Sequence, residues 1–467
     1  MLNYNNNVTI LLCYHSLMQI GEEYTVKIED FSNLGYGIAK INGFVIFVEN
    51  SCPQDIVKIK ITKMTKNYAH ASVIEIITPS PHRIKPFCPL QKVCGACQIQ
   101  FIDYDYQLQL KRKIVQDTLK SIGNIDIRVP LPIPSPQTKN YRRKIQYPIS
   151  QTKNSGRILA GYYKPKTHEI INIKYCPIQP EICDSIIDFI RIKAAELEIS
   201  GYSEKKHLGE LRHVLIRNSV YNNKNLVALV INNTKVSDKV KKLAKSIFDE
   251  FEEVSGVCVN FNTKQTNVIL GKETKCLFGS DYIEEKIIDK IFKVGVNTFF
   301  QINPESAENI FKYVKNYIQS NFNNPIVLDA YAGITSFGIV ISNVCKQVVS
   351  VEENKDSCKL AKEVIQSNNI TNIEIHKLDA AKFFEQETRK YDAIILDPPR
   401  KGCTKESLDY AYKLAKDTII YVSCNPATLA RDLKYLTETK GCRIDTIQPF
   451  DMFCHTYHIE NVAIIKV

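Results

Sequence analysis

Hydrophobic and polar residues alternate in the first part of the chain, between about residues 22 and 77. The alternating stretches are EYTVKIEDF, GIAKINGFVIFV, DIVKIKITKM and AHASVIEI, and glycine or asparagine interrupts them. Successive side chains of a strand point to opposite faces, so this period of two indicates half-buried strands. Several short strands at this spacing predict a small antiparallel β-barrel over residues 20–78.

From about residue 295 the pattern changes to continuous apolar runs that end in polar residues. The runs are IVLDAYAG, VVSVEEN, AIILDPP and TIIYVSCNP, and helical stretches such as SCKLAKEVIQSNN separate them. Strands that are apolar on both faces belong to parallel sheets covered by helices. We therefore expect an α/β domain over residues 291–467, with ligands bound beyond the carboxyl ends of its strands.

The region between these two, residues 79–290, is less regular and holds the excess charge. The 467-residue chain has a formal charge of +11, and residues 111–174 contain 14 Lys and Arg against three acidic residues. A basic face confined to one segment favours a polyanionic partner. Nucleic acid is favoured over a membrane because no basic amphipathic helix accompanies the charge. The alternative is a solvated surface in a lysine-rich protein.

The cysteine content indicates a reducing compartment. There are 15 cysteines, an odd number, and no secretory signal sequence is evident. A disulfide framework is therefore not expected, and we predict a cytoplasmic protein. The apolar stretch at residues 8–20 is too short to span a bilayer and lacks a basic flank, so no membrane attachment is expected.

Three acidic residues follow successive apolar runs of the C-terminal region: Asp329, Glu352 and Asp379. Gly333 permits a tight turn, and Glu352 stands 19 residues beyond it. This is near the ~20-residue spacing at which an acid meets ribose hydroxyls in nucleotide-binding units. The turn AGITSFG lacks the full G-x-G-x-x-G pattern, and each acid alone could cap a helix. Together the three acids favour a nucleotide pocket.

The last two apolar runs end in motifs whose side chains can take part in chemistry. Asp397 opens the sequence DPPR, whose two prolines stiffen the turn and hold the carboxylate at the rim, which suits recognition of a planar nucleobase. Cys424 follows TIIYVS and precedes Asn-Pro. A structural cysteine usually lies inside an apolar run. Cys424 instead lies where the chain leaves the sheet.

Five motifs, in order, resemble those of the RNA 5-methyluridine methyltransferases. They are FFQINP (299–304), LDAYAG (328–333), DPPRKG (397–402), SCNPATLARD (423–432) and HTYHIENV (455–462). The ribosomal-RNA branch of that family is the nearest, because a barrel like its TRAM domain and a cysteine cluster precede the catalytic part. The resemblance covers nearly the whole chain from about residue 20. It implies a Rossmann-like class I methyltransferase domain acting on 23S ribosomal RNA.

The resemblance also implies roles for individual residues. Carbon 5 of uracil is a poor nucleophile, so a thiolate first adds to carbon 6, and Cys424 is the implied nucleophile. S-adenosylmethionine supplies the methyl group, and Glu460 then removes the carbon 5 proton so that the thiolate can leave. The implied cofactor contacts are Gln301, Tyr331, Ser336, Glu352, Asp379 and Asp397. Asp397 is also a candidate contact to the uracil.

The chain departs from the family pattern in two places. Where the family usually has Cys-Gly-x-Gly in the nucleotide turn, this chain has AGIT at residues 332–335. A changed turn would affect Ser336 first among the implied contacts. Where the family commonly has proline before the final His-Thr, this chain has Cys454. Neither change removes a reacting group.

A second set of cysteines lies in the middle region. Cys88, Cys94 and Cys97 form a C-x5-C-x2-C run, and Cys176 follows at a distance. Such a set can enclose a tetrahedral metal or a cubane cluster, but zinc more often uses paired C-x2-C units and only one is present. The family resemblance favours a four-iron, four-sulfur cluster; four buried thiols are the alternative. Between Cys97 and Cys176, YRRK (141–144) combines phosphate-directed charge with a stacking ring.

The resulting hypothesis is a monomeric, cytoplasmic RNA (uracil-5-)-methyltransferase whose middle domain binds RNA. Three alternatives remain open. A transfer-RNA enzyme of the same family would share the catalytic motifs. A base-amine methyltransferase would use DPPR to polarise an amino group and would need no cysteine. An RNA-binding protein with an inactive methyltransferase fold would lose the pocket, whereas Cys424 and Glu460 are both present.

Overall fold

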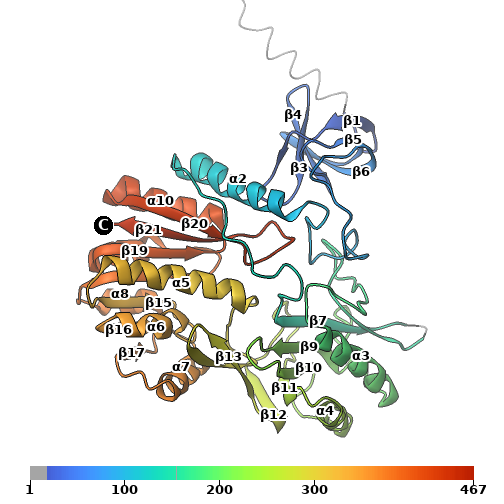
Figure 1. Cartoon of the computed structure of the whole chain (residues 1–467). Coiled ribbons are helices and arrows are strands. Elements are labelled where there is room, and N and C mark those ends of the chain that lie inside the picture. The colour runs from blue at the N-terminus through green and yellow to red at the C-terminus, as the bar shows by residue number, and fades with distance from the viewer. Residues whose placement is uncertain (1–17, 154) are drawn as a thin grey trace, which may run out of the picture. The chain divides into compact units, whose positions relative to one another are not determined.

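The computed structural model describes residues 18–153 and 155–467, so most of the apolar stretch at residues 8–20 lies outside the described residues. The chain separates into two compact units (Figure 1). The first contains residues up to 92, 96–117 and 455–457, and the second contains 93–95, 118–454 and 458–467. None of the described helices is long and apolar enough to cross a membrane.

The first unit contains a six-stranded sheet. Its strands are β1 (Glu23–Lys27), β2 (Asp30–Phe31), β3 (Gly37–Ile41), β4 (Phe44–Glu49), β5 (Ile56–Met64) and β6 (Tyr68–Thr78), in the order β1-β5-β6-β4-β3-β2. The predicted alternation is confirmed, because Ile46, Val48, Val57 and Ile59 form its buried core. One pairing differs from the antiparallel prediction: β4 and β6 are parallel. β6 is antiparallel to β5 and inserts between β4 and β5, which run in opposite directions, so it must be parallel to β4.

The helix α2 (Tyr104–Gly123) leads into the middle part of the chain, which forms a second six-stranded sheet. The strands are β7 (Lys144–Gln151), β8 (Ile158–Ala160), β9 (Leu211–Asn218), β10 (Asn225–Ile231), β11 (Val254–Phe261) and β12 (Glu273–Gly279), in the order β12-β11-β10-β9-β7-β8. The helices α3 (Glu181–Glu196) and α4 (Asp238–Glu250) pack against each other and against this sheet (Figure 1). β9 and β10 are buried along their whole length. A hairpin of β13 (Tyr282–Ile287) and β14 (Lys290–Gly295) follows.

The C-terminal part forms a seven-stranded sheet covered by helices. The strands are β15 (Ile326–Ala330), β16 (Gln347–Val351), β17 (Ile373–His376), β18 (Tyr391–Leu396), β19 (Ala415–Ser423), β20 (Arg443–Phe450) and β21 (Glu460–Lys466). The helices are α5 (Pro304–Asn321), α6 (Ser336–Ile341), the 3-10 turn η1 (Ser342–Val344), α7 (Lys355–Ser367), α8 (Ala380–Gln386), α9 (Lys405–Leu414) and α10 (Pro426–Lys440). α5 packs against α6, whereas α8 and α10 both pack against α9.

The spatial order of this sheet is β17-β16-β15-β18-β19-β21-β20. The parallel α/β prediction is confirmed for the first five strands. β21 differs, since it is antiparallel to both β19 and β20. The crossover through α10 brings β20 back in the direction of β19, and β21 then returns between them, so it runs against both.

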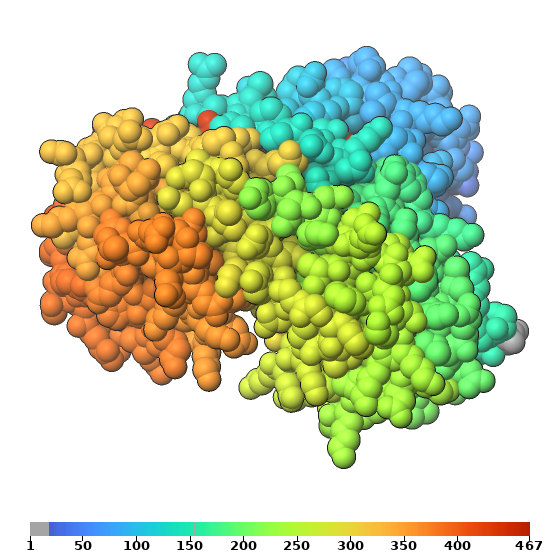
Figure 2. All heavy atoms as spheres, turned by 60° about the horizontal axis from the view of Figure 1, so that its bottom comes forward, coloured from blue at the N-terminus to red at the C-terminus, as the bar shows by residue number. Residues whose placement is uncertain are grey.

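The strand order reverses at β15, which lies between β16 and β18 although β16 follows it in sequence. In open α/β sheets, ligands bind in the crevice at such a reversal, beyond the carboxyl ends of the strands. One apolar core connects this sheet to the middle one, because Leu215 and Leu226 belong to the same cluster as Val327 and Ile395. Figure 2 shows an indentation of the surface between the yellow-green middle region and the orange C-terminal region.

Candidate active site

A pocket with an empty volume of about 380 Å³ lies at the carboxyl end of β15. It is lined by Phe299, Phe300, Gln301, Phe311, Tyr331, Ala332, Gly333, Ile334, Ser336, Phe337 and Asp397. Gln301, Tyr331, Ser336 and Asp397 are four of the six predicted cofactor contacts. They come from three separate motifs, which the sheet brings to one place. The mixture of aromatic rings with a few polar groups is typical of a small-molecule site.

The turn after β15 adopts a left-handed backbone at three positions: φ is 62° at Tyr331, 58° at Gly333 and 62° at Thr335. The Gly333 amide donates a hydrogen bond to Glu352 Oε2 at 2.9 Å, and Glu352 Oε1 accepts from the Asn354 amide at 2.7 Å. Glu352 therefore orders the turn that lines the pocket. Left-handed backbone is unfavourable for a β-branched residue such as threonine. Thr335, which belongs to the AGIT sequence that differs from the family pattern, is therefore strained.

The other two predicted acids are occupied within the fold. Asp379 caps α8, since its Oδ1 accepts hydrogen bonds from the amides of Ala381 and Lys382. Asp329 is fully buried and accepts from the Gly338 amide at 3.0 Å, and burial raises the pKa of its carboxyl to about 7. Neither residue lines the pocket. The helix-cap alternative describes Asp379 in this structure.

Cys424 lies just beyond the end of β19, which stops at Ser423, and α10 begins at Pro426. The prediction that it sits where the chain leaves the sheet is confirmed. The antiparallel register of β19 and β21 pairs Ser423 with Asn461. The next pair of residues in this register, Cys424 and Glu460, therefore lie opposite each other. β18 runs beside β19 and ends at Leu396. Asp397 therefore reaches the same edge of the sheet.

The charges at this edge influence one another. Glu460 is 7% exposed, and its pKa is raised to about 8. Burial is the main cause, Asp397 adds to the shift and Arg400 opposes it. The pKa of the Cys424 thiol is raised to about 11, chiefly by burial and further by the Glu460 charge, whereas Arg400 lowers it. Burial raises the pKa of Asp397 to about 7. Arg400 is thus the countercharge to the Cys424 thiol and the Glu460 carboxyl.

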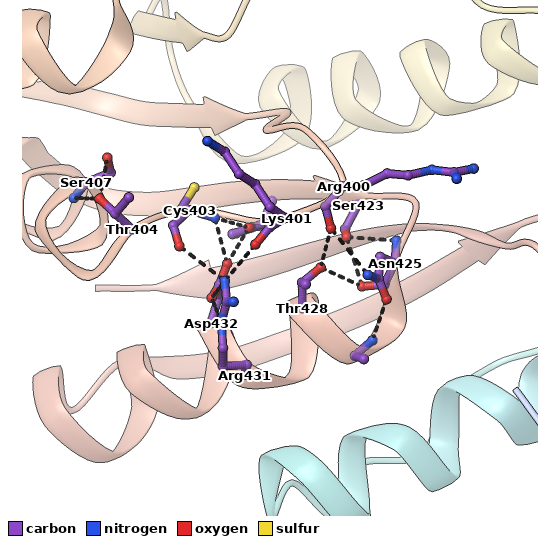
Figure 3. Close-up of polar contacts among 12 residues, drawn as sticks. Arg400, Lys401, Cys403, Thr404, Ser407, Ser423, Asn425, Thr428, Arg431 and Asp432 are labelled. Carbon is purple, nitrogen blue, oxygen red and sulfur yellow. Dashed lines mark hydrogen bonds and ion pairs between the residues drawn. The ribbon is translucent and has the colours of Figure 1, made fainter. Parts of the chain in front are cut away.

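The first turns of α10 hold the DPPR loop in place (Figure 3). The Arg400 carbonyl accepts from Asn425 Nδ2 at 3.2 Å and from Thr428 Oγ1 at 3.3 Å. Arg431 donates to the Lys401 carbonyl at 3.0 Å. These contacts fix the loop relative to Cys424, because Asn425 also caps α10 directly after the cysteine.

A buried carboxylate completes this support. Asp432 Oδ2 accepts from the Cys403 amide at 2.9 Å and from the Tyr421 hydroxyl at 2.6 Å. Gly402 has a φ of 74°, and a Cβ there would lie 2.5 Å from Asp432 Oδ2. The sequence interpretation assigned no role to Arg400 or to these supporting residues. The regular spacing of polar residues in SCNPATLARD, on one side of a helix, was the available signal.

The basic motif YRRK behaves differently from the prediction. Tyr141 is only 1% exposed and its hydroxyl donates to the Cys454 carbonyl at 2.9 Å. The predicted stacking ring is therefore wrong, because a buried ring cannot stack on a base. Arg143 donates from Nη1 to Asn218 Oδ1 at 2.6 Å, so it also belongs to the internal structure.

The four cysteines of the predicted metal site differ in burial: Cys88 and Cys94 are half-buried, and Cys97 and Cys176 are buried. Among the residues that the structure describes, no group of three or more His, Cys, Asp or Glu side chains is arranged to hold a metal ion. This arrangement does not fit the iron-sulfur prediction. No step of the chemistry below depends on such a cluster.

The sheet order, the glycine turn after β15 and the acid after β16 define an α/β fold of the nucleotide-binding class. Residues 103–466 match the tRNA (Uracil-5-)-methyltransferase family and residues 18–74 match the TRAM domain. The chain belongs to this family and is an RNA (uracil-5-)-methyltransferase, which argues against the base-amine alternative.

Relatives are similar over nearly the whole chain. A protein of Clostridium tetani named "Uncharacterized RNA methyltransferase" is 36% identical over 95% of this chain and 96% of its own length. An Oceanobacillus iheyensis protein of similar name is 34% identical over 95% and 96%. The solved Pyrococcus abyssi tRNA (uracil-54, C5)-methyltransferase in complex with S-adenosyl-L-homocysteine is 27% identical. It covers 95% of this chain and 100% of its own, with a TM-score of 0.76.

Proposed function

We propose that this protein transfers a methyl group from S-adenosylmethionine to carbon 5 of a uridine in RNA through a covalent adduct with Cys424. The observation that carries the proposal is the arrangement at the end of β19. There a cysteine whose pKa the Arg400 charge lowers lies opposite Glu460, at the edge of the sheet that also carries Asp397. A thiol nucleophile, a carboxylate base and a cation are the groups that this chemistry requires.

The residues would act in sequence. The Cys424 thiolate adds to carbon 6 of uracil and forms a C–S bond, which moves electron density onto carbon 5 and its adjacent carbonyl. S-adenosylmethionine, when bound, supplies the methyl group to carbon 5. Glu460 then takes the proton from carbon 5, the electron pair of that C–H bond restores the ring double bond, and the C–S bond breaks to release the thiolate. Arg400 stabilises the thiolate before addition and after release.

The pocket beside β15 is the proposed cofactor site. Gln301, Tyr331, Ser336 and Asp397 line it, and Glu352 orders its turn. The Pyrococcus abyssi enzyme, solved with S-adenosyl-L-homocysteine, supports this assignment because it matches the chain over its full length. Asp379 stays a proposed cofactor contact, although its carboxylate caps α8 in this structure.

The RNA substrate has two candidates. Ribosomal RNA of the 23S type is the first, because the sequence resembles that branch of the family. Transfer RNA is the second, and the Pyrococcus abyssi likeness favours it: that protein acts on tRNA and matches the region of the N-terminal sheet as well. The N-terminal sheet therefore does not discriminate between the two. We further propose a monomer with functional divisions at residues 20–78, 79–290 and 291–467.

The iron-sulfur cluster on Cys88, Cys94, Cys97 and Cys176 stays a prediction, since the described side chains form no metal-holding group. Iron analysis of protein purified without oxygen tests it. The prediction requires about four irons per chain. Protein with no iron, or with stoichiometric zinc, would leave the cysteines as ordinary thiols.

Nucleoside analysis tests the function directly. We expect purified protein with radiolabelled S-adenosylmethionine to place label on carbon 5 of uridine, and RNA with 5-fluorouridine to become covalently attached, since fluorine cannot leave as a proton does. Mapping the modification in ribosomal and transfer RNA from a deletion strain then identifies the substrate. Bound cofactor with no labelled uridine in either RNA would favour the inactive-fold alternative.

A further inference from the structure

The strands β7 and β9 present cations that have no acidic partner. Lys144 on β7 and Arg217 on β9 are directly opposite in the antiparallel pairing, so their side chains leave the same face of the sheet. The charged groups nearest to the Lys144 ammonium are Arg217 and Arg142, and no carboxylate acts on it among the described residues. Like charges directly opposite destabilise a sheet pairing. Such an arrangement needs a compensating group.

Arg217 is shielded from water, and Lys144 is half-buried. Arg217 is 3% exposed, its Nη2 donates to the Thr298 carbonyl, and its Nε has no partner among the described atoms. Burial lowers the pKa of Lys144 to about 7, with Arg217 and Arg142 adding to the shift, and burial lowers that of Arg217 to about 10. Buried charges are normally paired, because an unpaired buried charge loses its hydration and gains no interaction that compensates for the loss. The missing partner here is an anion.

The neighbouring Arg143 shows that acids are present in this region but directed elsewhere. Its side chain hydrogen-bonds to Asn218, and the carboxylates of Glu305 and Glu285 favour its charged form. Successive residues of a strand point to opposite faces. Glu305 and Glu285 therefore act on Arg143, whereas no carboxylate of the described residues acts on Lys144.

This uncompensated face adjoins the wall of the pocket. Arg217 binds the Thr298 carbonyl, and the Arg143 amide donates to the Ile302 carbonyl at 2.7 Å. Between these two anchors lie Phe299, which is 64% exposed, and Gln301; both line the pocket. Arg217 and the backbone of Arg143 are thus attached to the segment that lines the proposed cofactor pocket.

We propose that Lys144 and Arg142 bind a phosphodiester group of the RNA beside the methyl-transfer pocket, with the buried charge of Arg217 behind them. The proposal rests on the proposed function for the identity of the ligand as RNA. A phosphodiester has two free oxygens that share one negative charge, and it accepts hydrogen bonds from an ammonium and from a guanidinium fork at the same time. Such contacts position the strand without reading its sequence.

Binding of labelled poly(U), measured across potassium chloride concentrations, tests the proposal. Each lost phosphate contact on a single strand reduces the slope of log affinity against log salt by roughly 0.7. We expect this reduction in Lys144→Met, which keeps the apolar stem, with affinity at low salt reduced about fivefold or more. Lys242→Met, an exposed lysine on α4, is the matched control and keeps the wild-type slope. Lys144→Arg should restore it.

Two further measurements separate binding from folding. Calorimetry with S-adenosylhomocysteine should give the same affinity for Lys144→Met as for the wild type. In the wild type, an amine-directed reagent should label Lys144 rapidly, and poly(U) should suppress that labelling while Lys242 is unaffected. An unchanged salt slope in a folded Lys144→Met protein, or labelling of Lys144 that poly(U) does not reduce, would overturn the proposal. Absence of uridine methylation would instead count against the proposed function alone.

Discussion

Two charged groups in the second unit differ in sign but share a property. At the end of β19, Glu460 and Asp397 lie with the Cys424 thiol, and Arg400 is the cation that acts on Glu460 and Cys424. On β7 and β9, Lys144 lies opposite Arg217, and no carboxylate of the described residues acts on either of them. In both groups burial is the largest cause of the pKa shift, and it favours the neutral form.

The comparison indicates what each group lacks. Charges kept for stability are compensated inside the fold, as Asp432 is by Arg431 at 2.6 Å. A buried group that is left uncompensated costs stability and is retained where a ligand supplies the remaining interaction. The acidic group would receive a uracil ring and its proton. The basic group would receive a phosphate. The two together match the two halves of a nucleotide.

The largest effect on the group at the end of β19 is expected from removal of the Cys424 thiol. Cys424→Ala should lower the methylation rate by at least about 10⁴-fold, because the nucleophile has no substitute. S-adenosylhomocysteine should still bind, since Cys424 does not line the cofactor pocket. Single-turnover methylation and calorimetry measure the two properties. Half-buried Cys276 on β12 is no nucleophile in this scheme, so Cys276→Ala is a matched control with normal activity. A denaturation-resistant adduct with 5-fluorouridine RNA in Cys424→Ala would contradict the assignment.

Removing the base should block the second half of the reaction. Glu460→Gln keeps shape and hydrogen bonding but cannot accept the carbon 5 proton, so release should slow by about 10²–10⁴-fold. Denaturing gels with radiolabelled methyl donor should show a slow band of protein joined to RNA that already carries the label. Glu438→Gln on α10, an exposed carboxylate, should turn over normally. Free methylated RNA at the normal rate from Glu460→Gln would exclude Glu460 as the base.

The two groups should respond to pH in opposite directions. The folded-state pKa of Glu460, about 8, is above its ordinary value of 4.5, so its destabilising effect grows as pH rises from 4.5 and is complete above 8. The pKa of Lys144, about 7, is below its ordinary 10.5, so its effect grows as pH falls from 10.5 and is complete below 7.

Neutralising either group should therefore stabilise the substrate-free protein by about 1–2 kcal/mol. The gain for Glu460→Gln should increase with pH and the gain for Lys144→Met should decrease. Denaturant unfolding at several pH values measures both. If the stability gain changes with pH in the same direction in both variants, Glu460 and Lys144 do not have the opposite pH dependence expected here.

The smallest expected effect concerns an uncharged residue of the same pocket. Thr335 has a φ of 62° and its buried hydroxyl has no hydrogen-bond partner among the described residues. Thr335→Gly should relieve this strain and stabilise the protein by about 1 kcal/mol, although glycine loses more freedom on folding and offsets part of the gain. Chemical denaturation measures the change. Gly333→Ala, at a φ of 58° with open space around its Cβ, should do the opposite. A destabilised Thr335→Gly would indicate that the threonine side chain contributes packing that outweighs the strain.

The sequence alone determined the elements and most of the pocket. Period-two alternation identified the N-terminal strands, and apolar runs ending in polar residues identified β15, β16, β18 and β19, because these patterns follow from which faces are buried. The family resemblance added the contacts Gln301, Tyr331, Ser336 and Asp397, which line one pocket. Local sequence was sufficient here because parallel strands deliver their carboxyl ends to one edge.

Only the tertiary structure decided which groups face each other. The parallel pairing of β4 with β6 and the reversed β21 depend on where a returning strand inserts, and this depends on contacts far apart in the chain. Tyr141 appears available for stacking in the sequence, yet it is buried against Cys454. Asp379 caps a helix, and Lys144 meets Arg217 across 73 residues of chain. Charge compensation is a property of these pairings, which no local pattern contains.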